Sequence, residues 1–471
     1  MSTNVSGGYV ADLEYPAMFH RETAPTWLST MVSAIGQQAP AANRPFRYLD
    51  LGCGPALNIA LLAASNPLGS FVGVDFNESH IARGQELAAL LPNLTLRRAG
   101  FEELAADQDS PLLGDEPFDI IVLHGVYSWI SADARAAVRR IIQRNLAAGG
   151  LVYLHYTSHP GQSVFAGAQA MLRRIAALTA GGSEAGLANG LTVLKALKAG
   201  GAGYLLRHPE VAAMLEREGP NSAYLAHDLL ARDWAAFHVG DVIEEMANAG
   251  CAYVGSATPL DNVDALSVPG AAIPLIAKIP EIRARETARD LARNQSMRRD
   301  IYRRGLAGLT PDGYREQLGG LRFAALPGAL RTGELQLDMP IGPISASAEL
   351  IQPIRDRLRK GPAGFDELAG RQPHGPLLQG LLMLMVAGEV HPLAAPGADP
   401  RSALALNRHL LAAPASQAWL AAPAIGSAIF VEGEALAAAR ALLLGKPDPM
   451  PGRPQCETET LRAFQTLGML P

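Results

Sequence analysis

The sequence predicts an α/β fold built on a largely parallel sheet with helices on both faces. Short apolar runs alternate with segments of helical spacing through the first 180 residues, and this alternation is typical of parallel sheets. A chain of 471 residues favours more than one domain. With 48% apolar and 18% charged residues, the composition indicates a globular protein with an ample core.

Charge and cysteine usage narrow the class of protein. The formal net charge of -5 gives no reason to expect nucleic-acid or membrane partners. Cys53, Cys251 and Cys456 lie far apart, without metal-ligand spacing. The first residues lack the order of a secretory signal, and no apolar run is long enough to span a bilayer. We therefore expect a cytoplasmic protein with no metal.

Five apolar runs are expected to form strands, at residues 46–52, 70–76, 94–100, 118–125 and 150–157. Helical spacing separates them at residues 58–66, 80–91 and 132–146. Ligands of parallel sheets bind at the carboxyl ends of the strands, so the last residues of each run are candidates for a binding site.

The first two strand ends predict the cofactor. Asp50, Gly52 and Gly54 end the first run, where glycines let the backbone approach a ligand and turn into a helix. Asp75 ends the second run, where an acid can accept both hydroxyls of a ribose. A carboxylate at position 50 would repel a pyrophosphate but suits a cationic ammonium and sulfonium. The pattern favours S-adenosylmethionine over NAD.

The glycine turn resembles that of a known class of enzymes. The motif DLGCGPA at 50–56 is similar to the (D/E)xGxGxG motif of class I S-adenosylmethionine methyltransferases, with Ala56 in place of the last glycine. The resemblance implies a Rossmann-like domain in which Gly52 and Gly54 approach the methionine portion. It also implies that Asp75 takes the ribose and Phe76 packs on adenine.

The adenine-contact motif is matched less completely. AGFEEL at 99–104 resembles it, but Gly100 stands where many members carry an aspartate. The adenine contact is therefore expected near Phe101 or at Glu102.

Aromatic residues and histidines gather at the fourth and fifth strand ends, HGVYSWIS and YLHYTSHPG. Methyl transfer needs mainly alignment of a neutral nucleophile and exclusion of water. An aromatic channel would also lower the pKa of a lysine amine. The candidate catalytic residues are Tyr127, Trp129, Tyr156 and His124, and His124 could also contact the cofactor or act as a base. Core packing is the alternative for the aromatic residues, and hydrogen-bonded loop positions are favoured over metal binding for the histidines.

The amino-terminal segment has no place in the sheet. Tyr9, Tyr15 and Phe19 are spaced to lie on one side of a helix or helical turn. Such a segment could cover the cofactor as a lid, with Tyr15 or His20 reaching the methionine carboxylate. Packing of an added helix against the sheet is the alternative.

The remainder of the chain predicts two further domains. Residues 179–190 have the small-residue composition of a linker, and 191–250 are mostly helical in pattern. A lone strand is expected at 251–259 and a helix at 283–305, whose arginines could form an ion-paired face or grip an acidic partner.

From about residue 345 two helices and a strand suggest a winged-helix-like module. Its second helix, at 377–388, has no basic residue, so protein contact or domain packing is favoured over DNA binding. The expected domains are 1–180, a Rossmann-like cofactor domain; 191–330, a mainly helical middle domain; and 331–471, a winged-helix-like α+β domain with a tail.

A narrower resemblance rests on EYPAMFHRETAP, HGVYSWIS, LVYLHYTSHPG and NQSMRRDIYRRG. Over residues 9–395 the chain is similar to bacterial methyltransferases with a methyltransferase regulatory domain, among them outer-membrane-protein lysine methyltransferases. The resemblance implies a protein lysine as acceptor and S-adenosylhomocysteine as product. PGQ at 160–162 departs from the frequent PGW, and Thr157 replaces a common asparagine.

We therefore expect a methyltransferase acting on protein lysine. The alternatives are methylation of a small molecule, or a cofactor-binding regulatory protein without transfer activity. A homodimer is one option for the oligomeric state.

Overall fold

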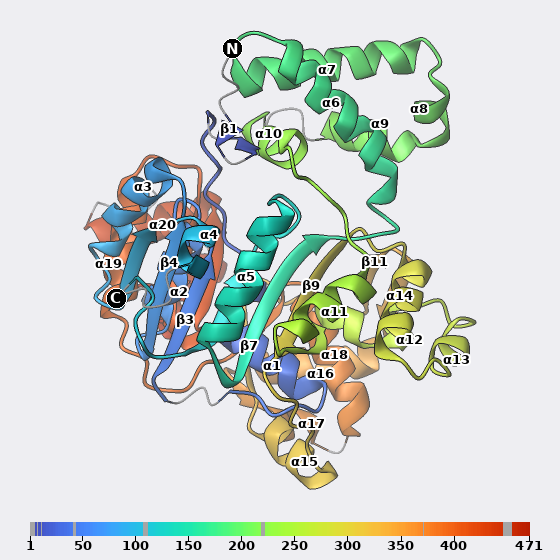
Figure 1. Ribbon diagram of the computed structural model, residues 1–471. Helices are drawn as coiled ribbons and strands as arrows, with labels where there is room; N and C mark the ends of the chain where they lie inside the picture. Colours follow the sequence, from blue (N-terminus) through green and yellow to red (C-terminus); the bar gives the residue numbers. More distant parts are fainter. Residues whose placement is uncertain are drawn as a thin grey trace.

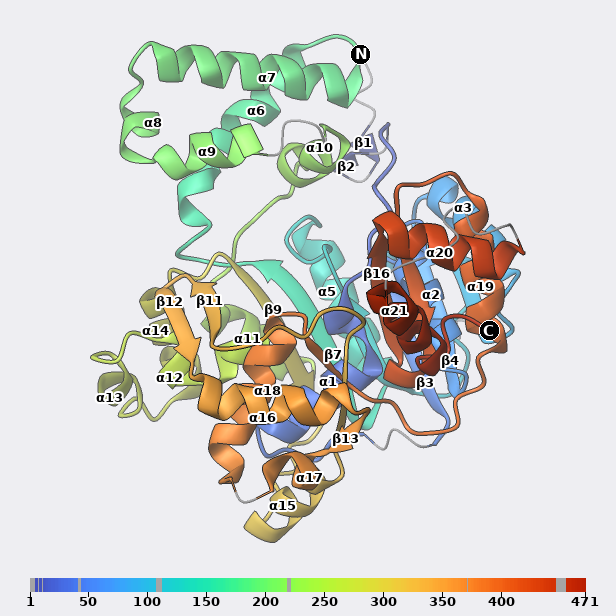
Figure 2. The same cartoon turned by 180° about the vertical axis from the view of Figure 1, so that it is seen from behind.

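The computed structural model describes residues 5–6, 8–10, 12–40, 44–106, 112–217, 222–370, 372–445 and 455–471. Figure 1 shows a central sheet with a helical insertion standing above it. Figure 2, from behind, shows the carboxyl-terminal segment packed on the face of the sheet opposite helix α5.

The sheet has seven strands in the order β5-β4-β3-β6-β7-β9-β8. The five expected strands are all present and mutually parallel: β3 Phe46–Leu51, β4 Gly69–Asp75, β5 Leu94–Arg98, β6 Phe118–Leu123 and β7 Leu146–Thr157. The helices between them are α2 Leu57–Ser65, α3 Glu78–Ala88, α4 Phe101–Ala106 and α5 Ala132–Asn145. The strand order reverses between β3 and β6, and such a switch point opens a crevice for a ligand.

Two later strands complete this sheet. β8 Ala252–Ser256 and β9 Met297–Arg303 follow α11 Val239–Asn248 and α14 Ile282–Arg293. β9 is antiparallel to both β7 and β8. The sheet thus continues beyond residue 180, into the segment expected to form a separate helical domain.

The expected strand at 251–259 is confirmed as β8, but it is not alone because it pairs with β9. The expectation of one helix over 283–305 is wrong. The helix ends at Arg293, and β9 follows with Arg298 and Asp300 buried. Charged residues hide this strand in the sequence, because a buried strand usually reads as an apolar run. Here the buried charges pair with each other, with 2.9 Å between Arg298 Nε and Asp300 Oδ1.

The helical insertion lies between β7 and α11. It contains α6 Ala166–Leu178, α7 Gly182–Ala199, α8 Gly203–Arg207, α9 Pro209–Arg217 and α10 Ser222–Leu230. Its own apolar cluster includes Val10 of the amino-terminal segment. The expected linker at 179–190 is instead largely the first turns of α7, because its small residues allow close helix packing: Gly186 lies against Ala176 of α6.

The amino-terminal segment is not helical where it was expected to be. β1 Val5–Ser6 and β2 Tyr9–Val10 form a small hairpin, and residues 12–20 then run without regular structure. We call residues 12–20 the strap. A short 3-10 turn, Arg21–Thr23, and helix α1 Pro25–Ala34 follow. Pro16 within the segment is consistent with an extended path, because proline disfavours the helical conformation of the residue before it.

The winged-helix-like module follows the sheet. Its strands are β10 Arg322–Ala325, β11 Leu335–Met339, β12 Gly342–Ala346, β13 Ala363–Gly364 and β14 Val390–Pro392. Its helices are α15 Pro311–Gly319, α16 Ala348–Arg359, α17 Phe365–Ala369 and α18 His374–Val386. β10 pairs with both β13 and β14, and Arg355 of α16 forms a buried ion pair with Glu389 at 2.7 Å.

The last described part, residues 401–445 and 455–470, is called the C-terminal module. It contains α19 Arg401–Ala412, β15 Gln417–Ala422, β16 Ser427–Glu432, α20 Gly433–Leu444 and α21 Gln455–Thr466. Two short helices, α12 Asp264–Ser267 and α13 Ile273–Ile276, lie between β8 and α14. Among the described helices, none combines the length and apolar character needed to cross a bilayer.

Candidate active site

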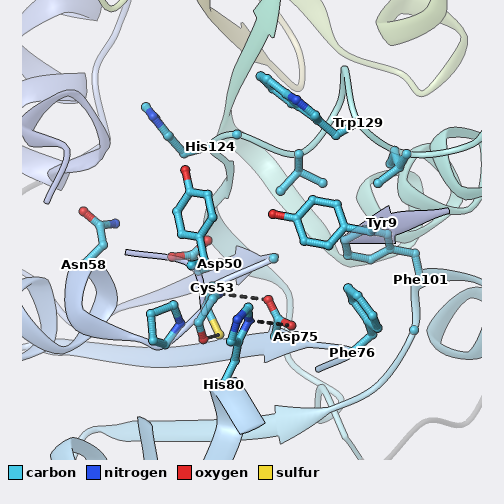
Figure 3. Close-up of a pocket in the computed structure, with 18 of the residues that line it drawn as sticks. Tyr9, Asp50, Cys53, Asn58, Asp75, Phe76, His80, Phe101, His124 and Trp129 are labelled. Atoms are coloured by element: carbon cyan, nitrogen blue, oxygen red, sulfur yellow. Dashed lines mark hydrogen bonds and ion pairs between the residues drawn. The ribbon is translucent and has the colours of Figure 1, made fainter. Parts of the chain in front are cut away.

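A cavity of about 300 Å³ opens at the carboxyl ends of β3, β4 and β6 (Figure 3). It lies at the switch point of the strand order, as expected for an open parallel sheet. The strap, the glycine turn, the end of β4 and the segment after β6 all contribute to its lining. The sequence-predicted residues in that lining are Tyr15, Asp50, Gly52, Gly54, Asp75, Phe76, Phe101, Glu102, His124 and Trp129.

The glycine turn after β3 brings the backbone close to the cavity. Gly52 has φ +87°, and a Cβ there would lie 2.5 Å from the Val126 side chain. Ala56, in place of the last motif glycine, takes the left-handed conformation with φ 65° directly before α2. The turn therefore keeps its shape without the third glycine.

Two carboxylates at adjacent strand ends have different surroundings. Asp75 Oδ2 accepts a hydrogen bond from Gly54 N at 2.9 Å, and Oδ1 accepts one from Asn77 N at 2.8 Å. Burial, followed by the neighbouring charge of Asp75, raises the pKa of Asp50 to about 7, against a hydrogen bond from Asn58 that lowers it. A cationic group placed beside Asp50 would favour its ionised form.

The far end of the cavity is aromatic. Phe76 and Phe101 lie on its wall together with Glu102 (Figure 3 labels both rings). The Tyr9 ring meets Phe76 edge to face with centroids 6.1 Å apart. Such rings suit a planar heterocycle.

Three imidazole rings are stacked on the other side. The centroids of His20 and His124 are 3.5 Å apart, and those of His124 and His155 are 4.2 Å apart. His124 Nδ1 is 2.9 Å from the Tyr153 hydroxyl, and His155 Nδ1 accepts from Gly125 N at 3.0 Å. Burial lowers the pKa of His20 to about 4 and that of His124 and His155 well below 6.5, so the stack is neutral near pH 7.

Trp129 also lines the cavity, and its indole donates a hydrogen bond to the Asp228 carbonyl at 3.1 Å. The other two aromatic candidates do not line it. The Tyr127 hydroxyl donates to Glu245 and accepts from Arg139 at 3.0 Å. The Tyr156 hydroxyl donates to Asp300 Oδ2 at 2.6 Å.

We therefore withdraw Tyr127 and Tyr156 as catalytic candidates. Both side chains are fully buried in the core. For Tyr156 the physical reason is the two-residue period of a strand, which points His155 and Tyr156 of β7 to opposite faces of the sheet.

The strap forms one part of the cavity lining. Its Tyr15 and His20 line the cavity, while Phe19 packs away from it against Trp419. His20 N donates to Asn58 Oδ1 at 3.0 Å.

Sequence reasoning missed several lining residues, including Asn58, His80 and Cys53. Figure 3 shows His80 beside Asp75, with 3.4 Å between His80 Nδ1 and Asp75 Oδ1. Asn58 and His80 each lie near the start of the helix that follows a strand end, and that position was the available signal. Among the residues that the structure describes, no group of three or more metal-ligating side chains has the arrangement of a metal site.

Comparison with known proteins identifies relatives of this chain. A family model described as a methyltransferase domain matches residues 49–152, and one described as a predicted methyltransferase regulatory domain matches residues 221–304. The uncharacterized protein sll1526 from Synechocystis sp. is 30% identical over 393 residues, covering 82% of this chain and 76% of that protein. The uncharacterized protein RP028 from Rickettsia prowazekii is 27% identical over 152 residues, covering 32% of this chain and 58% of its own.

Two solved structures have the same fold. PKMT2 from Rickettsia typhi superposes with a TM-score of 0.67 at 16% identity, covering 97% of this chain and 99% of its own. PKMT2 in complex with AdoHcy gives a TM-score of 0.65 at 17% identity, covering 90% and 88%. The match to the regulatory domain contains β8 and β9, so part of that family segment completes the central sheet.

Proposed function

Because this chain belongs to the S-adenosylmethionine-dependent methyltransferases that carry a methyltransferase regulatory domain, we propose that it methylates the side-chain amine of a lysine in a protein. Its cofactor is S-adenosylmethionine and its product is S-adenosylhomocysteine. The observation that carries the proposal is the part of the lining formed by Trp129 and His124, where an indole and a neutral imidazole make a weakly polar wall.

The residues around the glycine turn fit the cofactor. We assign the ribose hydroxyls to Asp75, whose carboxylate is already oriented by two backbone N–H groups. Asp50 is assigned to the ammonium, since this buried carboxylate has no lysine or arginine beside it in the described lining. The adenine is assigned to the wall that contains Phe76 and Phe101. The bound cofactor supplies an electrophilic methyl group on a sulfonium.

The opposite wall suits an amine that must be neutral to react. An apolar, desolvated surrounding disfavours the ammonium form of lysine and lowers its pKa. His124 Nδ1 is hydrogen-bonded to the Tyr153 hydroxyl, so Nε2 is the ring nitrogen that remains to contact a group in the cavity. The amine nitrogen forms the new N–C bond as the C–S bond breaks, and the methylated ammonium then releases its proton to water. The chain's part is to align the amine and exclude solvent.

The shared architecture with PKMT2 supports a macromolecular acceptor. The likeness extends over the insertion and both carboxyl-terminal parts as well as the sheet, since it covers 97% of this chain.

Tritiated S-adenosylmethionine, incubated with the purified protein and a fractionated bacterial lysate, tests the acceptor. We expect label in protein bands and methyl-lysine in their digests by mass spectrometry. Asp75→Ala serves as the control that should lose the label. Label found only in extractable metabolites would overturn the proposal in favour of a small-molecule acceptor.

A further inference from the structure

We propose that His20 binds the carboxylate of the cofactor's methionine portion, and that the C-terminal module holds His20 in place through the contact of Phe19 with Trp419. In this view Trp419 is a positioning residue, and the module belongs to the active site although it does not line the cavity. The proposal rests on S-adenosylmethionine as the cofactor and is independent of the acceptor.

The methionine portion carries an ammonium and a carboxylate on the same carbon atom. If Asp50 receives the ammonium, the group that receives the carboxylate must lie next to Asp50. The described lining of the cavity contains three acids, Asp50, Asp75 and Glu102, and no lysine or arginine. The carboxylate therefore needs a hydrogen-bond donor that is an imidazole, an amide or a hydroxyl.

His20 lies where this donor is needed. Its backbone N–H donates to Asn58 Oδ1 at 3.0 Å, and the Asn58 side chain also hydrogen-bonds Asp50. The His20 ring is flat against His124, with 17° between the planes. Within the described chain its recorded hydrogen bonds are made by the backbone, which leaves both ring nitrogens for a ligand. A bound carboxylate would also favour the protonated ring.

The residues on either side of His20 are anchored to the carboxyl-terminal half of the chain. Phe19 is only 5% exposed, and its ring centroid is 5.1 Å from that of Trp419 in β15. Arg21 donates to the Val386 carbonyl at 3.5 Å, and its guanidinium lies 4.8 Å from the Trp27 ring centroid. The strap at His20 is thus held from the side away from the cavity.

The C-terminal module is itself fixed to the helix that carries Asn58. Ser65 Oγ at the end of α2 donates to the Ser427 carbonyl at 2.6 Å, and Asn66 donates to the Gly426 carbonyl at 3.0 Å. Figure 2 shows this module lying over α2. Because α2 begins directly after the glycine turn, the module holds the turn, Asn58 and His20 in one rigid arrangement.

Calorimetric affinity for S-adenosylmethionine, measured on the full chain without an acceptor, tests the proposal. Loss of a charge-assisted hydrogen bond in His20→Ala should weaken binding roughly tenfold or more. We expect Trp419→Ala to weaken it by about fivefold to tenfold, on the same scale, and the double variant to bind no more weakly than His20→Ala. Trp419→Phe, which keeps a ring for Phe19, should restore affinity.

Phe430→Ala is the matched control. The ring centroid of Phe430 lies 5.2 Å from that of Trp419, but Phe430 is 40% exposed and is not part of the strap, so its loss should leave affinity unchanged. The proposal would be overturned if the double variant lost affinity by the product of the two single losses. It would also be overturned if Trp419→Ala lowered the melting temperature but left affinity unaltered. Should Trp419→Ala fail to fold, Phe19→Leu tests the same contact from the strap, with the same two outcomes. Failure of lysine methylation would leave this measurement untouched.

Discussion

The two carboxylates of the cavity differ because only one of them is matched by backbone donors. Asp75 accepts from Gly54 and Asn77, and its carboxylate also fixes the glycine turn. Asp50 is buried beside it with a raised pKa. The Asp75 carboxylate is thus oriented before the cofactor binds. The ionisation of Asp50 is expected to change when a cation is placed beside it.

Replacement of Asp75 by alanine should weaken S-adenosylmethionine binding by about 1–3 kcal/mol, as for the loss of hydrogen bonds to a charged group. The turn also loses an acceptor for Gly54 N, which adds to the effect. Calorimetry measures this change, with Asp312→Ala on an exposed helix start as the control. Unchanged affinity would contradict the assignment of the ribose to Asp75.

Binding should depend on pH through Asp50. The ammonium requires an ionised carboxylate, while the cofactor-free protein holds Asp50 with a pKa of about 7. Affinity should therefore rise as pH increases toward about 7, by at most about tenfold per unit for one proton, and then level off. Asp50→Asn should bind weakly with this part of the slope removed. A slope that survives in Asp50→Asn would assign the proton to another group.

The raised pKa of Asp50 also makes the stability of the folded protein depend on pH, in the direction opposite to cofactor affinity. Between about pH 4 and 7 the folded protein keeps a proton on Asp50 that the unfolded chain has lost. The contribution of Asp50 to the free energy of unfolding consequently falls as pH rises through that window. The pKa of His20 is lowered to about 4, so its contribution to the free energy of unfolding rises with pH between about pH 4 and 6.5.

Tyr156→Phe should reduce stability and leave cofactor affinity unchanged. Removal of its hydroxyl leaves the buried Asp300 with one donor fewer, at a cost of about 1–3 kcal/mol. Chemical denaturation measures the loss, and calorimetry at a temperature where the variant is folded measures affinity. A variant with full stability and impaired methyl transfer would restore the catalytic assignment.

At the scale of elements, the parallel strands were predictable because each is an apolar run bounded by turn residues. Strand β9 was not, since the partners of its buried Arg298 include Glu286 of α14 and Tyr253 of β8, which only the tertiary structure brings to it. Helix α7 was hidden by the glycines and alanines that let it pack closely on α6. The local sequence pattern identifies helices and strands that bury apolar side chains. It fails for elements whose charged or small residues are accommodated only by contacts with distant parts of the chain.

The candidate cofactor residues were predictable for the same reason: strand ends of a parallel sheet converge. The imidazole stack was not, because His20, His124 and His155 come from segments far apart in the sequence. The extended path of the strap was also not evident from its aromatic spacing.

Ser65→Ala should loosen the seat of the C-terminal module on α2. Its hydroxyl donates to the Ser427 carbonyl and accepts from Ala422 N at 3.1 Å, both in the interior. We expect a loss of about 1–3 kcal/mol in the free energy of unfolding, measured by denaturant titration. Ser70→Ala, at an exposed position of β4, should change it little. Equal effects of the two substitutions would contradict a structural role for this contact.

At the scale of the whole molecule, the strap joins the insertion to the sheet. Asp12 accepts from Ser183 N at 2.8 Å and from Ser183 Oγ at 2.6 Å, at the start of α7. His227 of α10 hydrogen-bonds the Leu13 carbonyl at 3.0 Å. Figure 1 shows the insertion standing above the sheet, and the strap couples it to the cavity together with the hydrogen bond from Trp129 to Asp228 of α10.

Asp12→Ala should therefore release the start of α7. Loss of a capping carboxylate costs about 0.5–2 kcal/mol, which should speed amide exchange in the first turn of α7 by up to about 30-fold. Hydrogen exchange with mass spectrometry measures this. Thr310→Ala, which removes the cap of α15 at Gly313 N, should act on α15 alone. Slow exchange at α7 in Asp12→Ala would show that the tether does not hold the insertion.

The late position of β9 in the sequence determines when the central sheet can be completed during translation. β7 pairs with β9 along residues 151–157, so a nascent chain that has emerged only to residue 180 presents the edge of β7 unprotected. About 120 further residues must leave the ribosome before Arg303 can close that edge, and the cover for α2 follows at the very end. Folding during translation is thus postponed for the catalytic half, and a gene truncated at residue 180 would yield an aggregation-prone product.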